Sequence, residues 1–344
     1  MADSNKPSRV VLITAPMEEG WLQRLRSQWP DLRFEYRSAR AHETISDDLW
    51  REVEVLYMSF ATPLPPEKVP KLRWVQLYSA GADYIFNHSL FHTQVIFTTT
   101  SGIHAIPIAE YVFTMVLAWY HRLPTLLDLQ KQGQWPQNSV RLTSLMPEEL
   151  RGKSIGIVGY GSIGRQVARL AQAFGMRILT MKRGSDHRDR GYQIANVGDP
   201  QGTLPARFFA PEQLHSMLAG CDVVLIAVPL TPSTRGMFNE AAFKAMKSTA
   251  FLVNIARGEV CNESDLIRAL EEKQIAGAAL DVFEHEPLPS DSPLWRLPNV
   301  FISPHISGLT PRYDERATEL FAENLRRSMT GEPLLNVVDK ALGY

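Results

Sequence analysis

The sequence predicts an α/β protein built on doubly wound parallel sheets, and three observations predict it. Short apolar runs of strand length alternate with amphipathic runs of helix length through most of the chain. A glycine-rich turn lies between one such strand and the helix that follows it. Polar motifs follow three later strands, at the chain positions where open α/β sheets bind their ligands.

The first third of the chain is expected to alternate short strands with helices. A long apolar helix then follows, with Pro107 at its first position and Glu110 in its first turn. After that helix, the stretch Gln130–Glu148 is a candidate domain boundary or arm. The expected strands are Arg9–Ala15, Val53–Met58 and Trp74–Leu77, and the expected helices are Trp21–Trp29 and Ile108–Arg122.

From Lys153 onward the strand–helix alternation becomes regular. The Gly184–Arg207 segment is polar, rich in Gly and Pro, and long for a connection between a strand and a helix, so we expect a mobile insertion there. The expected strands are Ser154–Val158, Arg177–Met181, Asp222–Val228, Ala250–Ile255, Gly277–Asp281 and Val300–Ser303, and the expected helices are Ile163–Phe174, Glu240–Met246 and Glu263–Glu272.

The composition excludes several functional classes. With 36 Lys and Arg against 37 Asp and Glu, the net charge of −1 gives no reason to expect binding to nucleic acid or to an anionic membrane. No apolar run approaches the ~20 residues that span a bilayer, and no secretory signal is visible. The two cysteines, Cys221 and Cys261, favour a reducing compartment and packing roles, so we expect a cytoplasmic protein. We expect no metal, because the nine histidines do not gather with other ligands.

The glycine-rich turn is Gly159-Tyr-Gly161-Ser-Ile-Gly164. Its first glycine permits the tight turn, its second lets the backbone approach a pyrophosphate, and its third lets the helix pack closely on the strand. The N-terminus of the following helix then offers N–H groups and a positive dipole end to the phosphates. The sequence therefore predicts a dinucleotide site here, the alternative being a purely structural turn.

The end of the second strand of this domain indicates which dinucleotide binds. An NAD site usually has an acidic residue there, whereas this strand ends in Lys182 and Arg183. Cations can bind a 2′-phosphate through charge-assisted hydrogen bonds. We therefore expect a preference for NADP(H), with NAD(H) still possible. The alternative is that both residues are solvated surface charges.

Three motifs that follow later strands complete a family pattern. They are Asn254-Ile-Ala-Arg257-Gly258, Asp281-Val-Phe-Glu284-His-Glu286-Pro287 and Ser303-Pro-His305-Ile-Ser-Gly308. In this order after the glycine loop, and with Ser79-Ala-Gly-Ala-Asp83 in the first domain, they resemble the D-isomer-specific 2-hydroxyacid dehydrogenase family. The resemblance covers nearly the whole chain.

The resemblance implies two Rossmann-like domains, with the cofactor domain inserted into a split substrate domain. The substrate domain would comprise residues 1–107 and 309–344, and the dinucleotide-binding domain residues 108–308. The family also implies a homodimer formed through the cofactor domain, and the stretch around Trp135 could form an arm that reaches the other subunit.

The implied activity is reduction of a 2-keto acid to a D-2-hydroxy acid by hydride transfer from a nicotinamide. His305 would be the acid/base, because a histidine titrates near neutral pH. Glu286 would orient its ring and stabilise the imidazolium. Arg257 would bind the substrate carboxylate through its planar fork and polarise the carbonyl.

Further ligands are expected for both substrate and coenzyme. Backbone N–H groups of Ser79, Ala80 and Gly81 could bind the substrate carboxylate, and Asp281 would hold the nicotinamide carboxamide. The remaining expected coenzyme contacts are Ser162, Ile163, Val228, Pro229, Thr234 and Ala256.

Several alternatives stay open. Glu284 competes with Glu286, although the residue before Pro287 matches the family position. The substrate could be glyoxylate or hydroxypyruvate, or a bulkier keto acid, which Phe60 and Tyr78 weakly favour. Formate dehydrogenases share the fold but resemble this chain less where Glu286 stands. A phosphoglycerate dehydrogenase with a regulatory extension is disfavoured, since we expect no further domain after Tyr344. A dinucleotide-sensing corepressor would keep the same motifs, and turnover of NADPH with 2-keto acids would separate the two functions.

Overall fold

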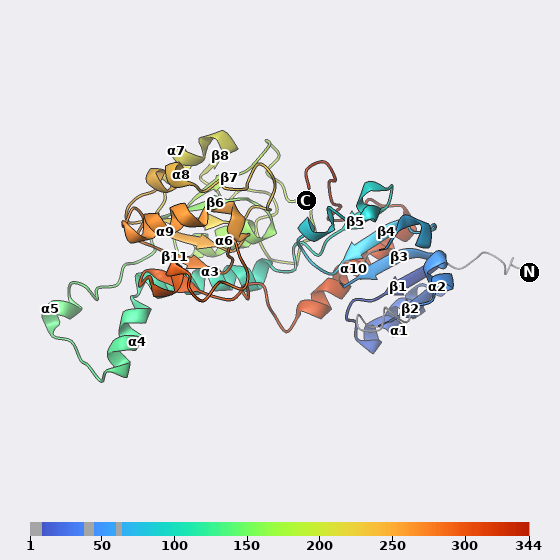
Figure 1. The fold of residues 1–344 in the computed structure, drawn as a ribbon, viewed down its shortest axis with the longest axis horizontal. Coiled ribbons are helices and arrows are strands. Elements are labelled where there is room, and N and C mark those ends of the chain that lie inside the picture. The colour runs from blue at the N-terminus through green and yellow to red at the C-terminus, as the bar shows by residue number, and fades with distance from the viewer. Residues whose placement is uncertain (1–8, 38–44, 60–63, 344) are drawn as a thin grey trace, which may run out of the picture. The chain divides into compact units, whose positions relative to one another are not determined.

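Two compact units, each built on one parallel sheet, make up the computed structural model (Figure 1), which describes residues 9–37, 45–59 and 64–343. Unit 1 comprises Met1–Ile103, Arg190–Tyr192 and Thr310–Tyr344, and unit 2 comprises His104–Asp189 and Gln193–Leu309. Unit 2 is therefore inserted into unit 1, and the predicted α/β fold class is confirmed.

The sheet of unit 1 has the strand order β2-β1-β3-β4-β5, and all its pairings are parallel. The short strands β1 and β3 are rich in Val, Leu and Ile and almost completely buried, as expected for a sheet covered on both faces. The strands are β1 (Arg9–Ile13), β2 (Leu32–Tyr36), β3 (Val53–Met58), β4 (Trp74–Leu77) and β5 (Ile96–Thr98).

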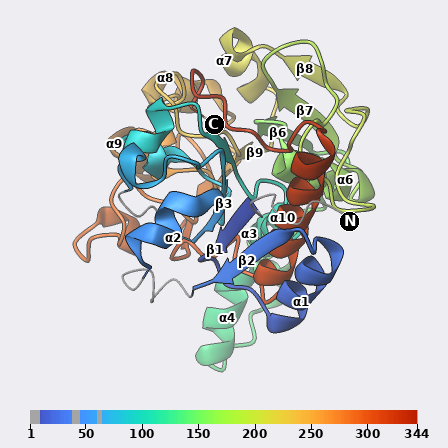
Figure 2. The same ribbon diagram turned by 90° about the vertical axis from the view of Figure 1, so that its right-hand side faces the viewer.

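Helices cover both faces of this sheet. One face packs against α1 (Glu19–Gln28) and α10 (Tyr313–Thr330), and the other against α2 (Asp47–Glu52) and short 3-10 helices. The C-terminal helix α10 lies along the sheet (Figure 1 and Figure 2), and its Phe321 ring stacks on Tyr57 at 4.5 Å between ring centroids. The returning C-terminal segment is thus part of the core of unit 1. The 3-10 helices of unit 1 are Pro66–Lys68, Asp83–Ile85 and Ser89–His92.

The sheet of unit 2 has the order β12-β11-β10-β9-β6-β7-β8, again with parallel pairings throughout. The strand order reverses between β6 and β9, which is where open α/β sheets bind ligands beyond their strand ends. The strands are β6 (Ser154–Val158), β7 (Arg177–Met181), β8 (Arg207–Phe209), β9 (Val223–Ile226), β10 (Phe251–Asn254), β11 (Gly277–Leu280) and β12 (Val300–Ile302).

Alternate residues of these strands pack into two separate cores. One core joins the sheet to α3 (Ala105–Tyr120) and α6 (Ser162–Ala173), where Phe113 and Phe174 stack at 5.0 Å. The other joins it to α7 (Leu214–Leu218), α8 (Glu240–Ala245) and α9 (Glu263–Glu271). The helices α4 (Leu123–Lys131) and α5 (Asn138–Arg141) form an arm that extends away from unit 2 (Figure 1). The 3-10 helices of unit 2 are Pro211–Gln213, Gly258–Val260 and Pro293–Arg296.

The position of Pro107 differs from the prediction. Helix α3 begins at Ala105, so Pro107 is its third residue rather than its first, and Glu110 lies beyond the first turn. The N–H groups of the first helical turn have no acceptor within the helix, so a proline at the third position costs no hydrogen bond. The helix therefore starts earlier than the proline indicated.

The Gly184–Arg207 segment, which we expected to be a mobile insertion, makes hydrogen bonds and packing contacts with other parts of the chain. Near its middle, Tyr192 packs with Ile103 and Leu320, and its N–H donates to the Oδ1 atom of Asn336 at 3.0 Å. For this reason Arg190–Tyr192 groups with unit 1, although we had assigned these residues to the cofactor domain.

No helix within the described ranges is long and apolar enough to cross a membrane. Nor do three or more His, Cys, Asp or Glu side chains of the described residues form a group that could hold a metal ion.

Candidate active site

The glycine loop connects β6 to α6 and has a different requirement at each glycine. Gly159 has a φ of +103°, and a Cβ there would lie 2.5 Å from the carbonyl oxygen of Ala227. A Cβ on Gly164 would lie 2.4 Å from the carbonyl oxygen of Gly159. A Cβ on Gly161 would meet no atom within 4 Å. Two of the glycines are thus required by packing, and the third faces open space.

The open space at Gly161 fits a dinucleotide pyrophosphate. Gly161 is the N-cap of α6, and no side chain caps this 12-residue helix. The N–H groups of Ser162, Ile163 and Gly164 form its first turn, where the helix dipole favours an anion. The loop therefore has the geometry and the donors that a bound nicotinamide dinucleotide needs.

The coenzyme residues expected elsewhere lie at the carboxyl ends of neighbouring strands. Lys182 and Arg183 follow β7, and the Lys182 ammonium donates to the carbonyl oxygen of Asp186. Val228 and Pro229 follow β9, where the carbonyl of Pro229 accepts a hydrogen bond of 2.6 Å from the Thr234 hydroxyl. The structure brings these residues to the same edge of the sheet as the glycine loop.

Arg257 follows β10 in a short, constrained turn. The Asn254 side chain fixes this turn by accepting from the N–H of Ala256 at 3.1 Å and donating to the carbonyl of Arg257 at 3.2 Å. Gly258 is required because a Cβ there would overlap the backbone of Phe283. The half-buried Arg257 side chain donates to the carbonyl of Ala256 at 2.8 Å.

His305 and Glu286 form the pair that we expected to be catalytic. The Nδ1 atom of His305 lies 2.7 Å from the Oε2 atom of Glu286, and the second carboxylate oxygen accepts from the N–H of Phe283 at 3.1 Å. The histidine side chain is 49% exposed. With Nδ1 engaged by the carboxylate, Nε2 is the nitrogen left for exchange of a proton with a substrate.

The competing carboxylate Glu284 has a different place. Its Oε1 atom accepts from the N–H of Glu263, the first residue of α9, at 2.9 Å. The Glu263 carboxylate in turn accepts from the N–H of Glu284 at 3.1 Å. Glu284 thus satisfies the N-terminus of a helix, while Glu286 lies at His305. The neighbouring His285 is exposed.

Asp281 organises the loop that carries His305. Its side chain is completely buried and accepts hydrogen bonds from the Ser303 hydroxyl at 2.5 Å, from the N–H of Ile306 at 2.9 Å and from the N–H of Ser307 at 2.9 Å. Its backbone carbonyl accepts from the N–H of His305 at 3.0 Å. We expected Asp281 only as a ligand of the nicotinamide carboxamide, so this structural role is an addition.

The Ser79–Gly81 loop lies in unit 1, after β4. The Ser79 hydroxyl lies 2.9 Å from the carbonyl of Gly81 and 2.8 Å from the Tyr84 hydroxyl. The Tyr313 hydroxyl donates to the carbonyl of Tyr78 at 2.8 Å, which ties the loop to α10. Phe60, named with Tyr78 as a sign of a bulky substrate, lies outside the described residues.

Comparison with known proteins decides the family. A model described as the D-isomer specific 2-hydroxyacid dehydrogenase, NAD binding domain, matches residues 113–307. The chain belongs to the D-isomer specific 2-hydroxyacid dehydrogenase family. Glyoxylate reductases of Thermococcus gammatolerans and Thermofilum pendens are 34% and 36% identical to it; the first alignment covers 96% of both chains, and the second 80% of this chain and 77% of the relative.

A solved structure extends the likeness to the whole dehydrogenase. The D-isomer specific 2-hydroxyacid dehydrogenase from Xanthobacter autotrophicus Py2, determined in complex with NADPH and MES, matches with a TM-score of 0.78 and 28% identity over 98% of this chain and 100% of that one. The dehydrogenase is therefore an oxidoreductase that interconverts a 2-keto acid and a 2-hydroxy acid with a nicotinamide coenzyme.

Sequence reasoning missed residues of the dehydrogenase that support this site. The Tyr111 hydroxyl lies 2.7 Å from the Ser303 hydroxyl, and burial is the main cause that raises the pKa of Tyr111 to about 12. Ser303 begins the motif that contains His305, but we predicted no role for it from the sequence. Its position two residues before His305, in a polar turn after a buried strand, is the signal that could have indicated a supporting role.

The two cysteines have the packing environment expected of them. Cys221 and Cys261 are both buried and unpaired, and burial raises the pKa of each thiol, that of Cys221 to about 12. Both are therefore protonated thiols near neutral pH, without nucleophilic character.

Proposed function

We propose that the dehydrogenase reduces a small 2-keto acid of the glyoxylate type to its 2-hydroxy acid, with NADPH as the preferred reductant. The observation that carries the proposal is the pair of His305 and Glu286, 2.7 Å apart on the edge of the sheet that also bears the glycine loop. The relatives at 34% and 36% identity, which are glyoxylate reductases, support the small substrate.

His305 acts as the proton donor in this proposal. Reduction adds a hydride to C2 of the keto acid and a proton to its carbonyl oxygen, so that C=O becomes CH–OH. The reduced nicotinamide supplies the hydride when it is bound. His305 gives up the proton from Nε2, and the Glu286 carboxylate keeps the ring oriented and stabilises its charged form. In the oxidative direction the neutral ring takes the proton back.

Arg257 binds the substrate carboxylate in this proposal. A guanidinium can hold a carboxylate through two parallel hydrogen bonds and can also polarise the adjacent carbonyl. The Arg257 turn is fixed by Asn254 and by close packing at Gly258, so the side chain starts from a defined position. We also expect the backbone N–H groups of Ser79, Ala80 and Gly81 to serve as uncharged donors to a substrate carboxylate.

The proposed NADPH preference depends on Lys182 and Arg183. Both lie at the end of β7, where NAD-binding domains have a carboxylate for the ribose hydroxyls, and this chain has no acidic residue at that strand end. The two cations favour a 2′-phosphate, which an acidic residue would repel. The expected contacts to the rest of the coenzyme come from Val228, Pro229, Thr234 and Ala256. The expected contact to the nicotinamide carboxamide comes from Asp281.

Oxidation of NADPH and of NADH, followed with a panel of 2-keto acids, tests the proposal. The panel runs from glyoxylate and hydroxypyruvate to branched and aryl keto acids. We expect the highest kcat/KM for a small acid with NADPH, and a D-configured product wherever C2 becomes chiral. Tight binding of NADPH without turnover of any acid would instead favour a dinucleotide-sensing binding protein, and a higher kcat/KM with NADH would contradict the coenzyme assignment.

We also propose that the dehydrogenase is a homodimer formed through the α4–α5 arm. Of the fifteen exposed large apolar side chains of the described residues, seven lie on this arm and in the turn directly after α5: Leu123, Leu126, Leu127, Trp135, Val140, Leu142 and Met146. Together they make an apolar surface of the kind that marks a protein–protein contact.

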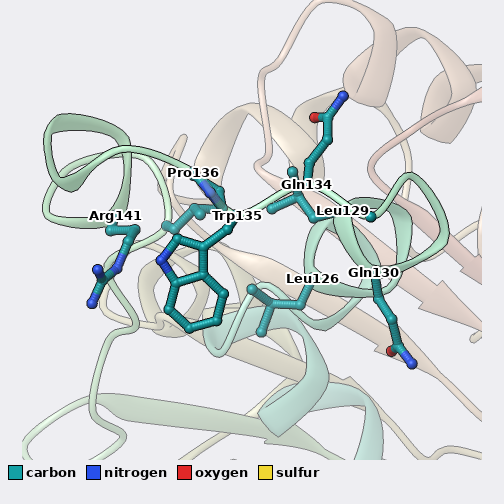
Figure 3. A pocket seen from close by; sticks show the side chains of 9 residues that line it. Leu126, Leu129, Gln130, Gln134, Trp135, Pro136 and Arg141 are labelled. Carbon is teal, nitrogen blue, oxygen red and sulfur yellow. The ribbon is translucent and has the colours of Figure 1, made fainter.

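The arm also contains a pocket. It has a volume of about 450 Å³ and is lined by Leu126, Leu129, Trp135 and Leu145 together with polar neighbours (Figure 3). Trp135 is 85% exposed, with the Arg141 guanidinium 5.5 Å from its ring centroid. The exposed ring of one arm is suited to enter the apolar pocket of a second copy, while its own pocket receives the ring of that copy.

The cellular site that we propose is the cytoplasm. The support is the pair of buried, unpaired cysteines, Cys221 and Cys261, which a reducing compartment keeps in this state.

A further inference from the structure

The Gly184–Arg207 insertion, which the proposed chemistry does not use, is attached to the coenzyme loop. Three of its attachments go to residues of the run Gly159–Gln166, which contains the dinucleotide fingerprint. The Tyr160 hydroxyl donates to the Asp199 carboxylate at 2.7 Å, and the Arg165 guanidinium donates to the Asp199 carbonyl at 2.5 Å. The Gln166 Oε1 atom accepts from the N–H of Gly198 at 2.7 Å.

The two attachments to Asp199 are buried, and the one through Gln166 is partly buried. Arg165 is 2% exposed, its guanidinium lies 4.7 Å from the Tyr160 ring centroid, and it also donates to the carbonyl of His187 at 2.7 Å. A buried guanidinium is costly unless its donors are satisfied, so the insertion supplies acceptors that Arg165 requires. Removing the insertion's acceptors would leave a charge unsatisfied beneath the glycine loop.

Asp199 is the centre of this network. Its carboxylate also accepts from the N–H of Thr203 at 3.1 Å and of Leu204 at 3.0 Å. Burial by itself would raise the pKa of Asp199, but the hydrogen bonds from Leu204, Tyr160 and Thr203 hold it below its usual value. The carboxylate is thus ionised at neutral pH, and its bonds to Thr203 and Leu204 close the turn that begins at Asp199.

The same insertion also contacts Lys182, the residue proposed to bind the coenzyme's 2′-phosphate. The Lys182 ammonium donates to the carbonyl of Asp186, and the Asp186 carboxylate accepts from the N–H of Arg188 at 3.0 Å. An ammonium has three N–H donors, so this contact restrains Lys182 and leaves donors for a phosphate. A lysine side chain is otherwise flexible and loses entropy when it binds.

We propose that the Gly184–Arg207 insertion is a specificity element for the 2′-phosphate of NADP(H): Tyr160, Arg165 and Gln166 fix it on the glycine loop, and it holds Lys182 in position through Asp186. The inference rests on the proposed preference for NADPH. Lys182 binds the phosphate, whereas Tyr160 and Gln166 are positioning residues that act through it.

A charge-neutral double variant, Tyr160→Phe with Gln166→Met, tests this role. It removes two attachments of the insertion and changes no charge near the phosphate. Dissociation constants of NADPH and NADH are measured by quenching of protein fluorescence. We expect the NADPH constant to rise roughly tenfold, a loss of about 1.4 kcal/mol in binding free energy, because the insertion no longer holds Lys182 in place. The NADH constant should change less than about twofold. Gln172→Met, an exposed substitution on the same helix, is the matched control.

A double-mutant cycle with Lys182→Ala separates positioning from general support of the loop. If the insertion acts through Lys182, the double variant weakens NADPH no further once Lys182 is absent. Equal weakening of NADPH and NADH, or full additivity with Lys182→Ala, would overturn the inference. If the double variant does not fold, Gln166→Met alone, which retains the bond between Tyr160 and Asp199, carries the same comparison.

The wild-type enzyme distinguishes failure of this inference from failure of the proposed coenzyme. A wild type that prefers NADH contradicts the NADPH assignment, and the inference falls with it. A wild type that prefers NADPH, combined with a double variant whose preference is unchanged, contradicts only the role of the insertion.

Discussion

His305 has a backbone conformation that few residues other than glycine adopt. Its φ of +53° lies in the left-handed region, which costs on the order of 1–3 kcal/mol for a residue with a Cβ. Its N–H donates to the carbonyl oxygens of Asp281 and Ser303, at 3.0 and 3.1 Å, and the buried Asp281 carboxylate holds the next two N–H groups. The surrounding hydrogen bonds thus impose the conformation that directs the imidazole toward Glu286.

The catalytic pair gives the first prediction. His305→Ala should lower kcat for keto-acid reduction by ~10²-fold or more, the scale of general acid–base catalysis, with little change in the dissociation constant of NADPH. Glu286→Gln should lower kcat by a smaller factor, because the ring loses the carboxylate that orients it. Steady-state kinetics between pH 5 and pH 9 measure both effects.

Glu284→Gln is the matched control for Glu286→Gln, since it lies in the same loop but accepts from the N-terminus of α9. A glutamine keeps that acceptor, so kcat and its pH profile should stay those of the wild type. A wild-type kcat in His305→Ala, or an equal loss in both glutamine variants, would remove the pair from the proposed role.

At the scale of elements, substitutions in the glycine loop distinguish an effect on folding stability from an effect on coenzyme binding. Gly161→Ala places a methyl group in open space at an ordinary φ of −84°, so the midpoint of thermal unfolding should not fall. The methyl occupies the space proposed for the pyrophosphate, so the dissociation constants of NADPH and NADH should both rise at least tenfold, a loss of about 1.4 kcal/mol or more in binding free energy.

Gly164→Ala should behave in the opposite way. Its Cβ would lie 2.4 Å from the carbonyl oxygen of Gly159 and 2.9 Å from Ile157, so α6 must move away from the sheet and the unfolding midpoint should fall by several degrees. Differential scanning fluorimetry with and without coenzyme measures both variants. A destabilised Gly161→Ala with normal coenzyme binding would contradict the placement of the pyrophosphate.

The α4–α5 arm carries the prediction on assembly. Trp135→Glu and Leu142→Glu place a charge on side chains that are 85% and 64% exposed in one chain, so neither should unfold unit 2. If the arm is the dimer contact, each charge is desolvated in the dimer and should convert it to monomers, as sedimentation equilibrium would show. Trp295→Glu, at a side chain that is 52% exposed elsewhere on unit 2, should leave the assembly unchanged. Dimers in all three variants would place the interface elsewhere.

The elements that sequence reasoning predicted best are the buried strands. The predicted bounds of Val53–Met58, Trp74–Leu77, Ser154–Val158 and Arg177–Met181 agree with the structure, because each is an apolar run bounded by polar residues or turns. The 18-residue helix α10 was not assigned, although Leu320, Phe321 and Leu325 have helical spacing, because charged residues are as frequent in its sequence as apolar ones. Strands of three residues, such as β8, depend on pairing with a neighbour and have no pattern of their own.

At the scale of the whole molecule, the site could be predicted as far as it depends on strand order. Glu286 and His305 follow β11 and β12, which pair in parallel, so two motifs 19 residues apart meet at one sheet edge. The contact between Tyr160 and Asp199 could not be predicted, because the insertion lacks periodicity and its path is set by tertiary contacts. The same is true of Asp281, whose partners become apparent only when the loop is folded.

Acid stability is a property of the whole molecule, because carboxylates with lowered pKa values occur in both units. In unit 2, burial would raise the pKa of Asp222, but hydrogen bonds from Lys247 and Ser154, both at 2.8 Å, lower it overall. In unit 1, hydrogen bonds from Arg326 are the main cause that lowers the pKa of Glu332 to about 2. A carboxylate with a depressed folded-state pKa stabilises the protein above its unfolded pKa of about 4, and this stabilisation is lost as the pH falls through the folded value.

The thermal unfolding midpoint should therefore change little between pH 7 and pH 5 and fall steeply below about pH 4. Asp222→Asn removes one contribution, so its midpoint should lie below that of the wild type at pH 7. The difference should shrink as the pH falls through the lowered pKa of the wild-type carboxyl. Asp31→Asn, at an exposed position in unit 1, is the control and should follow the wild type at every pH. A difference between Asp222→Asn and the wild type that stays constant or widens toward pH 3 would show that the carboxylate contributes through its shape and packing rather than through its charge.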